Sequence, residues 1–253
     1  QAAGVEPLLA RIYAARGVSD AAALERGLDR LPDPAHLPGL DAAAARLLAA
    51  RDAGERICVV GDYDADGATG TALAVRGLRA LGFSQVGFRV PDRFAHGYGL
   101  SPGIVADLVA ADRPDLIVTV DNGIASVEGV AAARAAGVEV VITDHHLPGE
   151  TLPAAAAITN PRLDPHSPFA EIAGVGVVFF LLVALRRLLR ARGEAQAVGL
   201  AEWLDLVALG TVADVVPLGA PNRILVEQGL RRMRAGRACF GIRALADVAG
   251  RDR

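Results

Sequence analysis

Acidic and imidazole side chains occur in three short segments of the sequence, each directly after a run of β-branched and other apolar residues. The carboxyl ends of parallel strands share one edge of a sheet, so we expect the three segments to meet in one crevice. Carboxylates gathered this closely repel one another unless cations neutralise them. The pattern therefore predicts a metal site. Its candidate members are Asp62, Asp64, Asp66, Asp121, Asp144, His145 and His146.

The types of ligand indicate which metal and which chemistry to expect. Carboxylates with one or two imidazoles suit Mn²⁺ or Mg²⁺ better than a metal selected by thiolates. Four or more acids exceed what one catalytic ion needs, which favours two ions about 3.5–4 Å apart with a shared carboxylate between them. Such a pair activates a water and holds the attacking and leaving oxygens, so the expected chemistry is displacement at phosphorus.

Each segment also has an ordinary interpretation. The segment 62–67 resembles the first half of a calcium-binding EF-hand loop, but Leu73 stands where that loop needs a bidentate Glu, and a strand precedes it instead of a helix. The segment 121–123 alone is typical of a plain turn, and a pair of neighbouring His residues is more often structural. Their occurrence at matching strand ends favours the metal site.

A further acid, Asp214, lies in the apolar segment 209–218, which Pro217 interrupts. Burial of a carboxylate without a partner is costly. Asp214 is therefore either a member of the same site or an ordinary capping or turn residue.

Short β-branched runs alternate with Ala-rich stretches from residue 56 onward, which predicts an α/β fold: a mostly parallel sheet with helices on both faces. The expected strands are 57–60, 86–90, 116–120, 138–142 and 155–159. The expected helices between them are 69–81, 101–111 and 126–136. After Pro168 the sequence predicts helices alone, at 176–192, 201–209 and 222–234.

Residues 1–54 predict a helical lead-in with Pro-rich breaks. Its expected helices are 5–16, 21–31 and a third that Asp41 caps and that ends near residue 52. Neither an internal repeat nor a low-complexity linker divides the remainder. We therefore expect a lead-in over 1–54 and one catalytic domain over 55–253.

Composition excludes several classes of protein. Two cysteines, Cys58 and Cys239, rule out a disulfide scaffold and a Cys-rich zinc site and fit a reducing compartment. All 26 basic residues are Arg, which excludes a lysine Schiff base, a P-loop lysine and a kinase lysine. The longest apolar run, 172–185, is too short to cross a bilayer, and no signal segment opens the chain, so we expect a cytoplasmic protein without membrane contact.

Three further features bear on the extent of the chain and on its substrate. The chain begins at Gln1 and its one methionine is Met233, so we expect a piece of a longer polypeptide. The net charge of −3 carries no signature of nucleic-acid binding, although two divalent ions would bring it to +1 (−3 + 4). Aromatic residues make up 4% of the chain, which leaves little material for base stacking.

Taken together, these segments resemble the DHH phosphoesterase family, and within it the bacterial exonucleases that degrade single strands from 5′ to 3′. The resemblance covers nearly the whole chain. Val60 stands where other branches of the family have a His. The resembling segments are 61–67, 92–94, 97–100, 120–124, 143–146, 173–177, 210–218 and 222–223.

The resemblance implies a role for each residue of the site. The implied metal ligands are Asp64, Asp66, Asp121, His145 and Asp214. The first two would bind different ions, and the third would bridge them. His146 would stabilise the scissile phosphate, and Asp62 and Asp144 would orient the ligands.

The resemblance also implies a Mn²⁺- or Mg²⁺-dependent exonuclease that acts on the 5′ end of single-stranded DNA in recombination and repair, with this chain as its catalytic core. Arg93 and Arg223, near the metal segments, are candidates for binding phosphates, and ordinary salt bridges are the alternative. The resemblance implies partnership with single-strand-binding protein and a helicase. It also implies a DHH-associated domain and an OB-fold, neither of which occurs in these residues.

Two other functions remain open at this point. One is a DHH phosphodiesterase of oligoribonucleotides or cyclic dinucleotides. Val60 and the segment 92–94 favour the exonuclease branch over this alternative. The other is a non-catalytic replication scaffold related to DHH enzymes. Such a scaffold would have lost ligand residues, whereas all five expected ligands are present.

Overall fold

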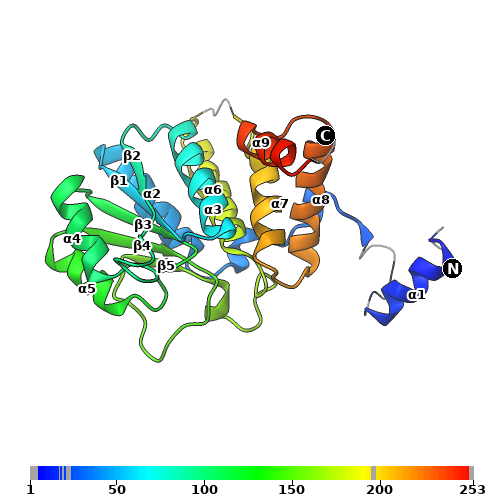
Figure 1. Ribbon diagram of the computed structural model, residues 1–253, viewed down its shortest axis with the longest axis horizontal. Helices are drawn as coiled ribbons and strands as arrows, with labels where there is room; N and C mark the ends of the chain where they lie inside the picture. The colour runs from blue at the N-terminus through cyan, green and yellow to red at the C-terminus, as the bar shows by residue number, and fades with distance from the viewer. Residues whose placement is uncertain (1–4, 17, 19, 21–23, 195–197, 251–253) are drawn as a thin grey trace.

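Five parallel strands form the centre of the computed structural model, which describes residues 5–16, 18, 20, 24–194 and 198–250. The strands lie in the order β2-β1-β3-β4-β5, and every neighbouring pair is parallel. Neighbouring parallel strands need crossover connections, and here helices provide most of them (Figure 1). The strands are β1 (Ile57–Gly61), β2 (Val86–Arg89), β3 (Leu116–Val120), β4 (Glu139–Thr143) and β5 (Ala157–Thr159).

Alternate side chains of the strands face two separate cores. Ile57 and Val59 of β1 belong to the larger core, which also contains residues of several helices. Cys58 and Val60 belong to the smaller core on the other face. Because side chains alternate along a strand, helices on both faces explain why the strand sequences are apolar throughout. The larger core holds α2 (Leu40–Ala53), α3 (Ala65–Ala80) and α6 (Gly174–Ala191), and the smaller holds α4 (Pro102–Ala111) and α5 (Val127–Ala135).

The helix α6 carries the longest apolar run of the chain into the larger core. It has 18 residues, and most of them are buried between the sheet, α2 and α3. Across the described residues, no helix has both the length and the apolar character that a membrane crossing needs.

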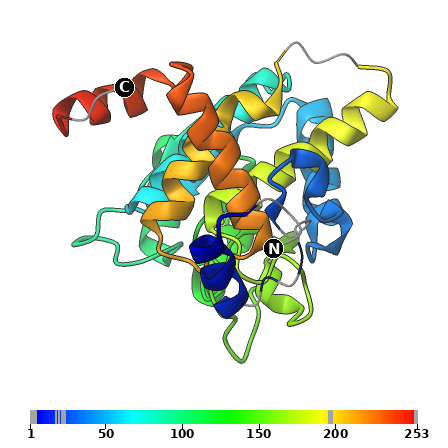
Figure 2. The same ribbon diagram turned by 90° about the vertical axis from the view of Figure 1, so that its right-hand side faces the viewer.

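Three helices make up the last described part of the chain. The helix α7 (Leu204–Ala213) packs against α3 and α8 (Ala220–Arg234), and α7 and α8 lie side by side in both views (Figures 1 and 2). The helix α9 (Phe240–Val248) begins beside the start of α7, where the Cys239 N–H donates to Asp205 at 2.6 Å. Asp214 ends α7 and therefore lies at the opposite end of that helix.

The predicted fold class is confirmed: a parallel sheet has helices on both faces, and helical segments precede and follow it. The remaining elements are short. They are α1 (Pro7–Ala15), η2 (Leu28–Arg30), η3 (Pro34–His36), η4 (Pro161–Leu163) and η5 (Leu200–Trp203).

Three details differ from the sequence prediction. Asp41 does not cap α2: Gly39, with φ 72°, precedes the helix, and Asp41 lies in its first turn. The prediction of a helix over 21–31 is wrong for residues 24–31, which contain the 3-10 turn η2 and no α-helix. Residues 21–23 lie outside the described residues. The helix α9 was not predicted.

The packing of an aromatic side chain of α6 against Phe169 predicts that truncation of that side chain causes a large loss of stability. Phe180 is 1% exposed, and its ring centroid lies 4.7 Å from that of Phe169. We expect Phe180→Ala to lower the free energy of unfolding by about 3–5 kcal/mol, because the lost burial leaves a cavity. The matched control Phe240→Ala, on a ring that is 84% exposed, should change it by less than about 0.5 kcal/mol. Urea unfolding measures both, and equal losses would contradict the assignment of the core.

Candidate metal centre

The strand order places the crevice at a topological switch point. From β1 the chain crosses through α3 to β2, on one side of β1, whereas from β3 it crosses through α5 to β4, on the other side. Ligands bind at such a point because the two connections diverge and leave a crevice between the strand ends. Asp62, Asp64 and Asp66 follow β1, and Asp121 follows the adjacent β3. The expected meeting of the segments is thus observed.

The acids and imidazoles converge in three overlapping groups whose possible ligand atoms lie within 4.8 Å of one another. Asp121 belongs to two of the groups, and His145 also belongs to two. Asp121 and His145 could therefore each contribute ligand atoms to more than one ion. The groups are Asp62, Asp64 and Asp121; Asp66, His145 and Asp214; and Asp121, His145 and His146.

Three atoms at the middle of the centre face one another without a hydrogen bond of good geometry among the described residues, although two of their separations are short enough for ion pairs. His145 Nε2 lies 3.0 Å from Asp121 Oδ1 and 3.7 Å from Asp214 Oδ2, yet none of these three buried atoms makes a hydrogen bond of good geometry. Buried polar atoms are normally paired, because an unpaired one costs about 1–3 kcal/mol. Three converging atoms that can all coordinate one cation explain this pattern, so the residues present fit a bound divalent metal.

The start of α6 holds Asp66. Both of its carboxylate oxygens accept backbone N–H groups of the first turn, from Gly174 at 2.6 Å and from Val175 at 2.9 Å, and the side chain is fully buried. The N-terminus of a helix favours an anion in this position. The two hydrogen bonds fix the orientation of the carboxylate toward His145, whose Nε2 lies 3.9 Å away.

Two glycines give the acids room, and the sequence analysis assigned no role to either. A Cβ atom on Gly174 would lie 2.7 Å from Asp121 Oδ1, and one on Gly210 would lie 2.9 Å from Asp66 Oδ1. Any side chain at these positions would therefore push on a candidate ligand. Their presence in the resembling segments 173–177 and 210–218 was the signal available from sequence.

The other acids after β1 and β3 are held by local backbone. Asp64 caps α3, with its Oδ1 accepting the Gly67 N–H at 2.8 Å, which is why α3 begins at Ala65, four residues earlier than predicted. Asp121 has φ 62°, in the left-handed region that Asp tolerates better than most residues. Asp62 is predicted to orient ligands, but its carboxylate also lies within reach of an ion.

Asp144 is saturated by hydrogen bonds. Its oxygens accept from Ile124 N at 2.9 Å, from His145 N at 2.7 Å, and from both the backbone N and Nδ1 of His146. Burial acts to raise the pKa of Asp144, but these hydrogen bonds and the charge of His146 outweigh burial and lower it. Asp144 therefore fixes the ring of His146 and the backbone of both histidines, and it does not lie in any of the three ligand groups.

Burial and crowding perturb the protonation of the centre. Burial, with the charge of Asp121, raises the pKa of Asp66 to about 7, and burial raises that of Asp121 to about 6. Burial lowers the pKa of His145, but the carboxylates of Asp121, Asp66 and Asp214 outweigh it and raise that pKa. The hydrogen bond to Asp144 raises the pKa of His146 to about 9. Each shift reflects excess negative charge in a space of low dielectric.

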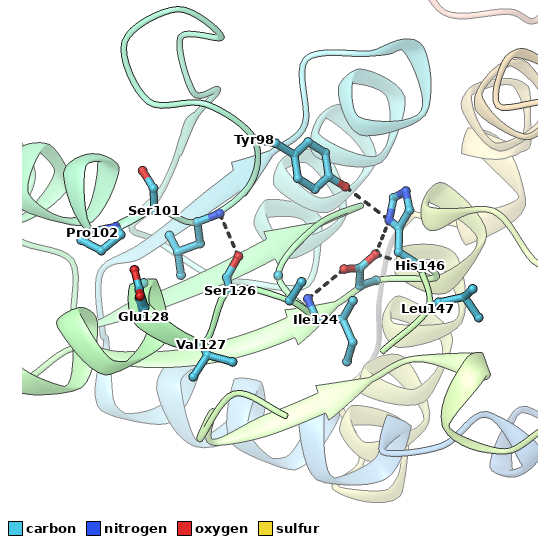
Figure 3. A pocket seen from close by; sticks show the side chains of 14 residues that line it. Tyr98, Ser101, Pro102, Ile124, Ser126, Val127, Glu128, His146 and Leu147 are labelled. Atoms are coloured by element: carbon cyan, nitrogen blue, oxygen red, sulfur yellow. Dashed lines mark hydrogen bonds and ion pairs between the residues drawn. The ribbon is translucent and has the colours of Figure 1, made fainter. Parts of the chain in front are cut away.

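A cleft of about 550 Å³ opens beside His146 between the loops after β2, β3 and β4 (Figure 3). The Tyr98 hydroxyl, at one end of the cleft, donates to the Asp121 carbonyl at 3.2 Å and lies 3.3 Å from His146 Nδ1. Residues of the cleft include Tyr98, Ser101, Pro102, Ile124, Ser126, Val127, Glu128, His146 and Leu147.

The two arginines proposed from sequence lie on different elements, Arg93 in the loop after β2 and Arg223 on α8. Arg93 is exposed and lies 5.0 Å over the ring of Tyr63, the residue between Asp62 and Asp64. Arg223 lies in the first turn of α8, and its charge, after burial, lowers the pKa of Arg26. Among the described residues neither Arg93 nor Arg223 forms an ion pair.

Comparison with known proteins identifies the family. The profile of the DHH family, N-terminal domain, matches residues 56–211. The chain belongs to the DHH family. The resemblance inferred from the sequence segments is thereby confirmed, and the DHH match spans the sheet, the smaller core and all but one of the candidate ligands.

Relatives within the DHH family are exonucleases. The chain is 54% identical, over 99% of its length and 44% of the relative, to the single-stranded-DNA-specific exonuclease RecJ of Salmonella typhimurium. It is similar to the crystal structure of RecJ in complex with Mn²⁺ from Thermus thermophilus, with a TM-score of 0.80 and 40% identity over 99% of this chain and 35% of that one.

A second solved structure, of exonuclease RecJ bound to manganese, has a TM-score of 0.73 and 44% identity over 87% of this chain and 53% of that one. The chain thus spans about half, or less, of the length of the relatives it matches. The fold and the family are shared with them over nearly all of this chain.

The pKa shifts predict how the stability of the metal-free chain depends on pH. Asp66 and Asp121 have folded-state pKa values above the ordinary value, so the folded protein binds more protons than the unfolded chain from about pH 4 to 7. Stability falls as pH rises through this window, and the raised pKa of His146 extends the fall. The stabilisation from Asp144, whose pKa is lowered, is already complete at about pH 5.5.

We therefore expect the metal-free chain to lose stability on the order of 3–5 kcal/mol between about pH 5.5 and pH 8. Asp121→Asn should make the loss smaller, because it removes one of the repelling charges, whereas Asp41→Asn, at an exposed position of α2, should not. Chemical denaturation in the presence of EDTA measures this. Stability that rises with pH over this range would contradict the inferred charge crowding.

Proposed function

We propose that this chain is the catalytic core of a metal-dependent exonuclease that degrades single-stranded DNA from 5′ to 3′ in recombination and repair. The observation that carries the proposal is the convergence of three buried atoms, on Asp121, His145 and Asp214, that make no hydrogen bond of good geometry among the described residues, at the switch point of a DHH fold. The single-stranded-DNA-specific exonucleases among the relatives support the choice of substrate.

The proposed ligands of two Mn²⁺ or Mg²⁺ ions are Asp64, Asp66, Asp121, His145 and Asp214. The manganese- and magnesium-bound relatives support this choice of metals. When bound, the ions would activate a water and neutralise the charge that develops on the phosphate oxygens. In this proposal Asp121 is shared by the two ions, because it belongs to two groups of ligand atoms.

His146 is the proposed residue that contacts the scissile phosphate. Its Nδ1 is engaged by Asp144 at 2.7 Å, which leaves Nε2 for the substrate. The raised pKa, about 9, keeps the imidazole protonated at neutral pH, so it would donate a hydrogen bond to a phosphate oxygen. Asp62 and Asp144 would orient the ligands. Arg93 and Arg223 are proposed to bind phosphates, which their lack of ion pairs within the described residues supports.

Several wider parts of the proposal rest on sequence alone. The division into a lead-in over 1–54 and a catalytic domain over 55–253 and the location in the cytoplasm come from the sequence pattern, and the partnership with single-strand-binding protein and a helicase comes from the family resemblance. A comparison of 5′-phosphorylated single-stranded DNA with dinucleotides and oligoribonucleotides as substrates would distinguish the exonuclease from other DHH phosphodiesterases. Preference for the dinucleotides would overturn the choice of DNA.

The bridging role of Asp121 predicts a severe loss of activity on truncation. We expect Asp121→Ala to lower Mn²⁺-dependent cleavage of single-stranded DNA by more than about a hundred-fold, beyond the usual effect of losing a residue that only supports a metal ligand. The fold should persist, as judged by circular dichroism, because the variant also removes a source of repulsion. Asp41→Ala is the surface control. Wild-type rates in Asp121→Ala would refute the bridging role.

The proposed phosphate contact of Arg93 predicts a change in salt dependence. We expect Arg93→Ala to raise KM for single-stranded DNA and to reduce the slope of log affinity against log salt by about 0.7, the contribution of one phosphate contact on a single strand. The control is Arg187→Ala, which removes a guanidinium already paired with Asp41 at 2.6 Å. An unchanged salt slope in Arg93→Ala would contradict the phosphate contact.

A further inference from the structure

A buried amide joins two segments of the chain that hold different candidate ligands. Asn222 lies in the first turn of α8 and is 1% exposed. Its Nδ2 donates to the Glu171 carbonyl at 2.7 Å and to the Pro217 carbonyl at 2.9 Å. Both partners are acceptors, so the nitrogen of the amide, and not its oxygen, must face them. One side chain thus bridges the segment before α6 and the turn after α7.

Each of the two bridged carbonyls lies three residues along the chain from a part of the metal centre. Pro217 follows Asp214, the residue that ends α7. Glu171 precedes Gly174, whose N–H donates to Asp66 at 2.6 Å. Asp66 and Asp214 belong to the same group of possible ligand atoms. The amide therefore connects one ligand of this group to the helix end that holds the other.

The turn after α7 is strained and open to water. Val215 has φ 63° and is 84% exposed. A β-branched residue in the left-handed region is unfavourable and persists only where the surrounding structure fixes it. The Gly219 N–H donates to the Pro217 carbonyl at 2.9 Å, and Val216 packs at the edge of the larger core. Asn222 adds a hydrogen bond from a different element, which restrains the turn in its strained form.

The helix α8 gives the amide a rigid support. A Cβ atom on Gly229 would collide with the Leu204 carbonyl, so α8 and α7 touch at their backbones, and they lie side by side in Figure 2. A Cβ atom on Gly219 would lie 2.6 Å from Glu171 Oε2, so the start of α8 also approaches the segment before α6. Close backbone packing on both sides fixes the place from which the amide donates.

We propose that Asn222 is a positioning residue that clamps the turn after α7 to the segment before α6 and so fixes the separation between Asp214 and Asp66. The proposal deepens the proposed function and rests on it for the identity of the metal. Without this clamp the strained turn relaxes and carries Asp214 away from His145, whose Nε2 lies 3.7 Å from its Oδ2. Removal of a group that orients a metal ligand lowers metal affinity by about 10- to 100-fold.

The affinity of this chain for Mn²⁺, measured by isothermal titration calorimetry, tests the clamp. We expect Asn222→Ala to weaken Mn²⁺ binding by about 10- to 100-fold while circular dichroism shows a retained fold. An amide that serves only general stability would lower the unfolding midpoint and leave the affinity of the folded protein unchanged. Unchanged affinity in Asn222→Ala would therefore overturn the proposal.

Asp205→Ala is the matched control. Asp205 is fully buried at the other end of α7, and it also joins two segments, because its carboxylate accepts the N–H groups of Leu206 at 3.0 Å and of Cys239 at 2.6 Å. This variant loses as many hydrogen bonds as Asn222→Ala, far along the helix from Asp214. Its affinity for Mn²⁺ should equal that of the wild-type protein. Equal losses of affinity in the two variants would overturn the clamp.

A double-mutant cycle shows whether the clamp acts through Asp214. In an Asp214→Ala background, Asn222→Ala should cause no further loss of Mn²⁺ affinity, because the ligand that it positions is gone. A further loss as large as in the wild-type background would overturn the proposal. If Asn222→Ala does not fold, Asn222→Ser takes its place in both backgrounds, since its hydroxyl can donate to one of the two carbonyls. The same outcomes then decide.

Metal binding is measured without DNA, so the clamp and the proposed function can fail separately. If the wild-type protein binds Mn²⁺ and the variants behave as expected, but single-stranded DNA is not cleaved, the proposed function fails and the clamp stands. If the variants bind Mn²⁺ as the wild-type protein does and DNA is cleaved, the clamp alone fails. If the wild-type protein binds no Mn²⁺, both are overturned.

Discussion

The structure depends on a concentration of negative charge that the fold buries at one edge of its sheet. Asp66 and Asp121 are almost fully removed from water and lie close to further carboxylates, so burial and repulsion raise their pKa values. A fold that gains nothing from this crowding would be expected to relax it. The chain instead fixes the acids in place, which is the arrangement that a divalent cation stabilises and that water alone does not.

The surrounding elements serve to hold this charge. The N-terminus of α6 directs two N–H groups at Asp66, and Gly174 and Gly210 let backbone approach the carboxylates. On the opposite side, Asp144 accepts hydrogen bonds from the backbone of both histidines and from the ring of His146, and so sets the orientation of the His146 imidazole. Precise placement of ligands thus comes from backbone groups on rigid elements, which costs little reorganisation when an ion binds.

Much of the fold and of the centre could be predicted from sequence because the signals are local. Runs of β-branched residues predict strands such as Leu116–Val120. The carboxyl ends of parallel strands share one edge of a sheet, so the acids that follow the strands can be expected to lie together. The close approaches could not be derived in this way, because contacts such as Gly210 to Asp66 join segments that are far apart in the chain. The role of Tyr98 likewise depends on a hydrogen bond to Asp121 across two loops.

Diffraction from crystals grown with Mn²⁺ tests the central claim most directly, since anomalous scattering locates manganese without reference to activity. The account predicts two peaks about 3.5–4 Å apart, with the Asp121 carboxylate between them and His145 and Asp214 beside one of them. A single peak away from Asp121, or none at saturating Mn²⁺, would contradict it.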